Sequence, residues 1–171
     1  MANIFEVPQP SNDLLEKANK VRLASIEISQ TENQNRIKAL NSMADYLEKN
    51  SKEILEANNE DYSIAEKKGI SRALLSRLKL SKSKLNSGIE GVRKVGELAD
   101  PVNQVQIKRE LSNGLILERK TVPIGVLGVI FDSRPDAVMQ ISSLAIRSGN
   151  GVMLKGGSCL LYTSPSPRDC Q

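Results

Sequence analysis

The chain has 171 residues, of which 39% are hydrophobic, and this is enough for one domain with a proper core. Its formal net charge is +4, its acidic and basic residues are interleaved, and only 3% of its residues are aromatic. Neither a basic patch nor a set of stacking aromatic side chains therefore points to nucleic-acid binding. No apolar run is long enough to span a membrane, and the first residues lack the pattern of a secretory signal.

The chain contains no histidine and two cysteines. The absence of histidine excludes a Ser-His-Asp or Cys-His nucleophile within these residues, and it excludes zinc ligation by histidine. Two cysteines alone cannot close a structural zinc site, so we predict no metal site. The cysteines have no disulfide-framework spacing, and we expect a reducing, cytoplasmic setting.

The first hundred residues predict helices, because apolar residues recur there every three or four positions. The predicted helices begin near Ser11, Thr31, Ser51, Asp61, Ser71 and Ser81. We expect two short helices between Ser51 and Gly69, of which the second follows Asp61 and ends at the glycine. The last predicted helix is stopped by Asp100 and Pro101.

The pattern changes after Pro101. The pair Asn113-Gly114 is a turn signal between two alternating segments, so residues 104–110 and 115–122 are predicted to form a β-hairpin. Residues 126–131 are apolar and mostly β-branched, which is typical of a strand buried on both faces of a parallel sheet. A helical pattern follows, ends at Gly149-Asn150-Gly151, and leads to a second apolar strand at 152–154. The sequence therefore predicts one βαβ unit.

Two loops follow these predicted parallel strands, at the edge where an open α/β sheet binds its ligand. Lys155 with Gly156 and Gly157 suits a phosphate or ribose, because glycines let a ligand approach the backbone. Ser133 and Arg134 could donate hydrogen bonds to an oxyanion or a carboxylate. From the residues alone, a plain glycine turn with a solvated lysine and a helix-capping turn with a solvated arginine are favoured, because neither standard phosphate-loop motif is present.

The segment VPIGVLGVIFDSRPDAVMQISSLAIRSGNGVMLKGGS resembles the γ-glutamyl phosphate reductase family of the aldehyde dehydrogenase superfamily. The family pattern is roughly PIGV-GVI-ESRP, a helix, and SGNA-[IL]L[RK]GG. Asp132 replaces the usual glutamate, and Gly151 replaces a common alanine. The segments LEANNEDYSIAEKKGISRALLSRLKLS and GVRKVGELADPVNQV are also similar to the family, so the resemblance covers about residues 12–158.

This resemblance implies an incomplete α/β fold of the aldehyde dehydrogenase type. We expect a helical amino-terminal part at 1–100, a β-hairpin at 101–122, and the first βαβ unit of a Rossmann-like NADP-binding domain at 123–158. The implied activity is NADPH-dependent reduction of L-glutamyl 5-phosphate to L-glutamate 5-semialdehyde and phosphate, the second step of proline biosynthesis. The implied partners are the small-molecule substrate, a glutamate 5-kinase and further copies of the full-length enzyme.

By the same resemblance, Lys155, Gly156 and Gly157 bind the adenosine ribose of the cofactor, and Ser133 and Pro135 lie beside the nicotinamide. Arg134 is assigned to the substrate's phosphate or carboxylate. The family's nucleophilic cysteine lies downstream, so we expect no catalytic residue among these 171 and an inactive chain on its own. Another aldehyde or acyl-phosphate dehydrogenase and a non-catalytic nucleotide-binding or interaction module stay open as alternatives.

Residues 159–171 share no pattern with the preceding chain and contain both cysteines, Cys159 and Cys170. The stretch CLLYTSPSPRD resembles the translation of a transposase-type sequencing adapter, and we interpret 159–171 as a non-native tail. A disordered serine- and proline-rich linker is the alternative.

Overall fold

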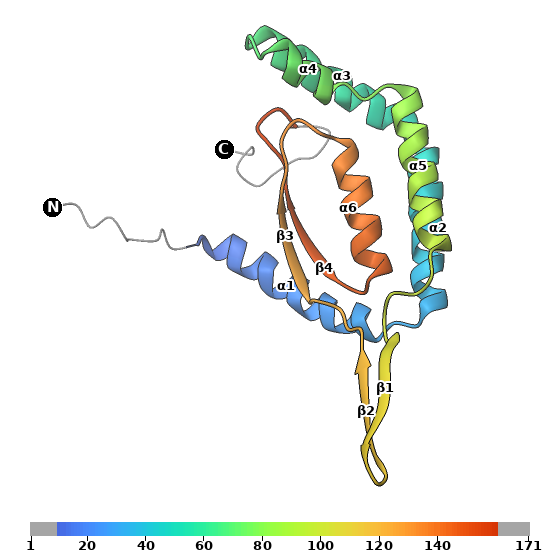
Figure 1. Ribbon diagram of the computed structural model, residues 1–171. Coiled ribbons are helices and arrows are strands. Elements are labelled where there is room, and N and C mark those ends of the chain that lie inside the picture. The colour runs from blue at the N-terminus through green and yellow to red at the C-terminus, as the bar shows by residue number, and fades with distance from the viewer. Residues whose placement is uncertain (1–9, 161–171) are drawn as a thin grey trace, which may run out of the picture.

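The computed structural model describes residues 10–160 and contains five helices, a hairpin and a βαβ unit in chain order (Figure 1). The elements are α1 (Asn12–Gln30), α2 (Asn33–Lys49), α3 (Ser51–Lys67), α4 (Arg72–Leu78), α5 (Lys82–Glu97), β1 (Val105–Ser112), β2 (Leu115–Lys120), β3 (Val126–Ile130), α6 (Asp136–Arg147) and β4 (Gly151–Lys155). This arrangement confirms the predicted fold class. None of the helices in residues 10–160 is long and apolar enough to cross a membrane.

The main core lies where α2, α5 and α6 pack against one another (Figure 1). Its buried side chains share a helical spacing and are Leu40, Ala44, Leu80, Leu85, Ile89, Val92 and Met139. Two predicted serine caps are confirmed, because Ser11 accepts a hydrogen bond from the Leu14 amide and Ser81 accepts one from the Lys84 amide. The buried faces of α2 and α5 therefore follow from the helical spacing of apolar residues in the sequence.

The prediction of two short helices between Ser51 and Gly69 is wrong, because a single helix, α3, runs from Ser51 to Lys67. Asp61 does not start a helix. It lies inside α3, 2% exposed, on the same face as the buried Asn58 and Ala65. The spacing of these three residues places them on the side of α3 that faces the protein, and this packing holds the helix continuous.

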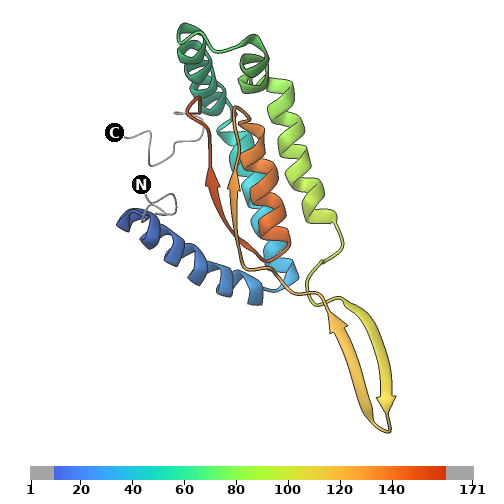
Figure 2. The same cartoon turned by 60° about the vertical axis from the view of Figure 1, so that its left-hand side comes forward.

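The predicted hairpin is confirmed, with β1 and β2 antiparallel and Gly114 at a φ of +77° in the turn. Figure 2 shows the hairpin extending away from the rest of the chain. All six residues of β2 are exposed, including three apolar side chains at Leu115, Ile116 and Leu117. The hairpin therefore contributes little to the core of residues 10–160.

The βαβ unit is also confirmed, since β3 and β4 pair in parallel from Val126 opposite Gly151 to Ile130 opposite Lys155. The expectation that this first strand is buried on both faces is wrong, because Ile130 is 84% and Val126 is 38% exposed. Within residues 10–160, β3 has β4 as its sole strand neighbour, and α1 and α6 pack mainly against β4. One edge and part of one face of β3 are left uncovered.

Two buried arginines tie the helices together below the strands. Arg36 forms a 2.6 Å ion pair with Asp100 and donates to the Thr31 carbonyl. Arg147 donates to the Asn33 side chain and to the Leu98 carbonyl. These bonds fix the end of α6 against the start of α2 and the loop after α5.

The predicted boundaries at residues 100, 122 and 158 stay a prediction. Most of the predicted tail, residues 161–171 with Cys170, lies outside the described residues. Of its first two residues, Leu160 is fully buried against Ala65, Leu75 and Leu78, and Cys159 packs beside this cluster.

Candidate functional site

The two loops at the carboxyl ends of β3 and β4 touch each other. The Phe131 amide donates to the Lys155 carbonyl at 3.1 Å, which continues the strand pairing into the loops. Gly157 then lies so close to Asp132 that a Cβ at residue 157 would overlap the aspartate carboxylate. A side chain at residue 157 would therefore displace the Asp132 carboxylate, and the expectation that both loops share one edge of the sheet is confirmed.

Lys155 holds the only cationic side chain on the second loop, residues 155–158. Its side chain is half-buried, and its ammonium donates to the Gly156 carbonyl at 2.8 Å. Gly156 is buried and Gly157 is half-buried. The loop therefore offers one cation and a backbone without side chains, which is suited to ribose hydroxyls or phosphate.

Ser133 and Pro135 shape the first loop from inside the protein. Ser133 has a φ of +43°, is 1% exposed, and donates to the Asp132 carboxylate at 3.3 Å. Pro135 is buried at the amino-terminal cap of α6. Since neither side chain is open to solvent, both residues contribute mainly through the backbone shape that they impose.

Arg134 is an exposed residue of the first loop. Its side chain is 58% exposed, forms a 3.5 Å ion pair with Asp136, and lines a groove between α5 and α6. The structure thus brings Asp132, the neighbour of Ser133, against Gly157, and it places Arg134 at the groove between α5 and α6.

This groove has a volume of about 920 Å³ and is lined by residues from α4, α5, α6 and the loop before α6. Arg77 and Lys84 line it together with Arg134. Sequence reasoning missed both residues, because each reads as a solvated cation on a helix. For Lys84, the sequence offered one indication of its position, because the predicted helix start at Ser81 places this lysine in the first turn of that helix.

Within residues 10–160, no group of three or more histidine, cysteine, aspartate or glutamate side chains could hold a metal ion. Cys159 is the described free cysteine and is half-buried beside the Leu160 cluster.

No family model matches the chain. It is 90% identical over 166 residues to the γ-glutamyl phosphate reductase of Prochlorococcus marinus strain MIT 9215, covering 97% of this chain and 38% of the relative. It is 92% identical over 158 residues to the reductase of strain AS9601, covering 92% of this chain and 36% of the relative. The chain thus spans less than two fifths of the length of these curated relatives.

Two solved structures share the fold. The γ-glutamyl phosphate reductase of Saccharomyces cerevisiae superposes with a TM-score of 0.86 at 38% identity, over 91% of this chain and 39% of that one. The reductase of Thermotoga maritima gives a TM-score of 0.85 at 37% identity, over 89% of this chain and 37% of that one. Because sequence and fold agree over almost the whole described chain, we conclude that it matches part of a γ-glutamyl phosphate reductase.

Proposed function

We propose that this chain is part of an enzyme that reduces L-glutamyl 5-phosphate to L-glutamate 5-semialdehyde with NADPH and releases phosphate, a step of proline biosynthesis. The observation that supports this most strongly is 90% identity over 166 residues to a γ-glutamyl phosphate reductase. Since the match covers 38% of that relative, the proposal assigns the complete reaction to a longer protein and one edge of the site to this chain.

Residues of the two loops fit one edge of a dinucleotide. The Lys155 ammonium has a backbone carbonyl as its hydrogen-bond partner, so it can turn toward a ribose hydroxyl without breaking an ion pair. Gly156 and Gly157 would present backbone without side chains to the ribose, and the nicotinamide would lie beside the loop that contains Ser133 and Pro135. When bound, NADPH supplies the hydride for the reduction.

The carbonyl chemistry needs a nucleophile, which we assign to a cysteine thiolate outside the described residues. The thiolate attacks the acyl carbonyl, the bond from carbon to the phosphate oxygen breaks, and a thioester remains. Hydride transfer to this thioester then breaks the carbon–sulfur bond, which yields the aldehyde and restores the thiolate. This chain's residues take part by orienting the cofactor.

The same proposal includes a partner enzyme, an oligomeric state and a cellular compartment. An acyl phosphate must be made by phosphoryl transfer to a carboxylate, so a glutamate 5-kinase is the partner that we expect upstream. The hairpin β1–β2, with exposed apolar side chains, supports assembly into a homo-oligomer. We place the enzyme in the cytoplasm.

Two alternatives differ in their consequences. A dehydrogenase for another acyl phosphate or aldehyde would keep the cofactor loops and change the substrate. A non-catalytic nucleotide-binding module would bind NADPH tightly as the isolated chain, whereas our proposal predicts weak binding because this chain supplies one edge of the cofactor site.

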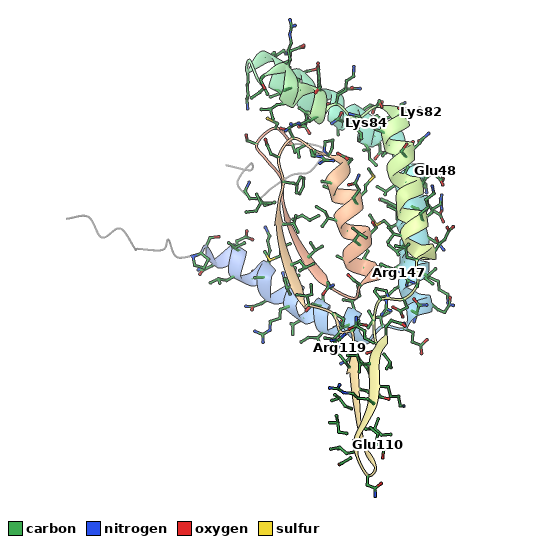
Figure 3. The ribbon with its side chains drawn as sticks, in the orientation of Figure 1. Glu48, Lys82, Lys84, Glu110, Arg119 and Arg147 are labelled. Carbon is green, nitrogen blue, oxygen red and sulfur yellow. The ribbon has the colours of Figure 1, made fainter. Side chains whose placement is uncertain are left out.

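A chimera tests the proposal. Residues 1–158 of this chain are joined to the remainder of the strain MIT 9215 reductase, and phosphate-dependent reduction of NADP⁺ by L-glutamate 5-semialdehyde is measured. We expect the chimera to have an activity within a few fold of the parent reductase. Its Lys155→Ala variant should have a KM for NADP⁺ raised by about tenfold, because it loses one charge-assisted hydrogen bond. Lys82→Ala, an exposed lysine labelled in Figure 3, is the matched control and should change nothing. A folded but inactive chimera would refute the assignment.

A further inference from the structure

The groove between α4, α5 and α6 has an uneven charge. Three cations line it, at Arg77, Lys84 and Arg134, and Asp136 is the one acidic residue among the lining residues in the described part of the chain. These residues come from three separate segments, and Figure 3 places Lys84 at the end of α5 that adjoins α4. The fold therefore gathers cations that the sequence keeps far apart.

The charges of these cations are only partly neutralised. Asp136 pairs with Arg134 at 3.5 Å. The Lys84 ammonium donates to the carbonyls of Ser76 and Lys79, and no carboxylate among residues 10–160 forms an ion pair with it. Arg77 is exposed on α4 and lines the groove, so its guanidinium, which carries N–H donors, can reach a ligand there.

Three serines also line the groove, at Ser76, Ser83 and Ser87. The Ser76 hydroxyl donates to the Ala73 carbonyl, and the hydroxyl groups of Ser81 and Ser83 lie 2.9 Å apart. Ser83 and Asp136 belong to the first turns of α5 and α6, and the amino-terminal ends of helices favour anions. The cationic side of the groove is therefore suited to a group with several oxygen atoms and a negative charge.

The remaining lining is mixed, with polar side chains at Gln140 and Ser143. Its apolar side chains are Val92, Val95 and Leu144, and Gly91 leaves open space because no atom lies within 4 Å of the position that a Cβ would occupy. A ligand that fits both regions carries an oxyanion on a short aliphatic chain. The substrate of the proposed reaction has this form, with a carboxylate and a phosphate on a short carbon chain.

We propose that Arg77, with Arg134 and Lys84, binds an oxyanion of the acyl-phosphate substrate in this groove. The inference rests on the proposed function, and it adds two residues, Arg77 and Lys84, as determinants of substrate specificity. The shared chemistry is an oxyanion, which is either the phosphate or the carboxylate of the substrate. Replacing Arg77 gives the clearest test, because this residue is exposed and its replacement leaves the core intact.

The first experiment uses the 171-residue chain and acetyl phosphate as the probe. Backbone amide chemical shifts are followed by NMR at constant ionic strength in the parent chain, Arg77→Gln and Arg72→Gln. Arg72 is an exposed arginine of α4 that does not line the groove, so it is the matched control. We expect saturable shifts at groove residues, a Kd raised by about tenfold in Arg77→Gln, and no change in Arg72→Gln. Equal affinity in the parent and Arg77→Gln, or shifts that do not saturate, would overturn the proposal.

A second experiment separates the two oxyanions in the chimera of residues 1–158 with the strain MIT 9215 reductase. A higher KM for phosphate in Arg77→Gln assigns the groove to the phosphate, and a higher KM for the semialdehyde assigns it to the carboxylate. The KM for NADP⁺ should stay constant in both cases. If all three KM values are unchanged, the groove proposal is wrong while the reductase proposal stands. If the parent chimera is inactive, the reductase proposal fails, and the titration of the 171-residue chain still decides whether the groove binds an oxyanion.

Discussion

Asn58 is the residue whose removal we expect to destabilise the fold most clearly. It is 1% exposed on α3, and its side chain bonds to the backbone on both sides of the turn between α4 and α5. The amide nitrogen donates to the Leu78 carbonyl at 2.9 Å, and the amide oxygen accepts from the Leu80 amide at 2.7 Å. This turn joins the helices that carry Arg77 and Lys84.

Replacing Asn58 with alanine leaves one buried carbonyl and one buried N–H without their partner. A buried polar group without a hydrogen bond costs about 1–3 kcal/mol, so the two together predict a loss of about 2–6 kcal/mol in the free energy of unfolding. For a chain of this size, each kcal/mol lowers the Tm by roughly 2–4 °C.

Chemical denaturation of the 171-residue chain and of Asn58→Ala measures this loss. Asn59→Ala is the matched control, because Asn59 is the exposed neighbour of Asn58 on the same helix, and we expect it to stay within about 0.5 kcal/mol of the parent. A loss of less than about 0.5 kcal/mol in Asn58→Ala would refute the claim that this side chain fastens the turn.

Gly151→Ala should lower stability by about 1–3 kcal/mol in a denaturant melt, because the new Cβ would lie 3.1 Å from the Val21 carbonyl oxygen of α1; an unchanged melt would contradict this packing. Gly91→Ala should instead raise stability by about 0.5–1 kcal/mol, since its Cβ meets open space and alanine favours the helix; a loss would contradict it. Hydrogen bonds from Lys108 above all lower the pKa of Glu118 from its ordinary 4.5 to about 2. Because the folded pKa is the lower one, this stabilisation is present above about pH 4.5 and is lost as the pH falls toward 2. Carbon-13 titration of the carboxyl should give the low pKa, Lys108→Gln should raise it, and an ordinary pKa in the parent would refute the pairing.

The local parts of the fold could be predicted from the sequence. Ser11 and Ser81 cap helices because their hydroxyl groups bond to amides three residues away, and Asn113-Gly114 turns a hairpin through a positive φ at the glycine. These features depend on neighbouring residues alone. The βαβ unit followed in the same way from its two apolar strands and the helix between them.

Features set by tertiary packing could not be predicted. Asp61 has the residue type of a helix cap, yet the packing of α3 against the rest of the chain keeps it inside the helix. Ile130 belongs to an apolar run, and its exposure depends on which strands lie beside β3. Likewise, Arg77 and Arg134 belong to distant segments, and only the packing of α4, α5 and α6 brings them to one groove.

The position of the cofactor tests the account most directly. A crystal structure of the chimera with NADP⁺ should show the ribose at the carboxyl ends of β3 and β4, within hydrogen-bonding distance of the Lys155 ammonium. The nicotinamide should then lie beside the loop that contains Ser133 and Pro135. NADP⁺ bound away from Lys155 and the Gly156-Gly157 turn would contradict the assignment of these loops to the cofactor.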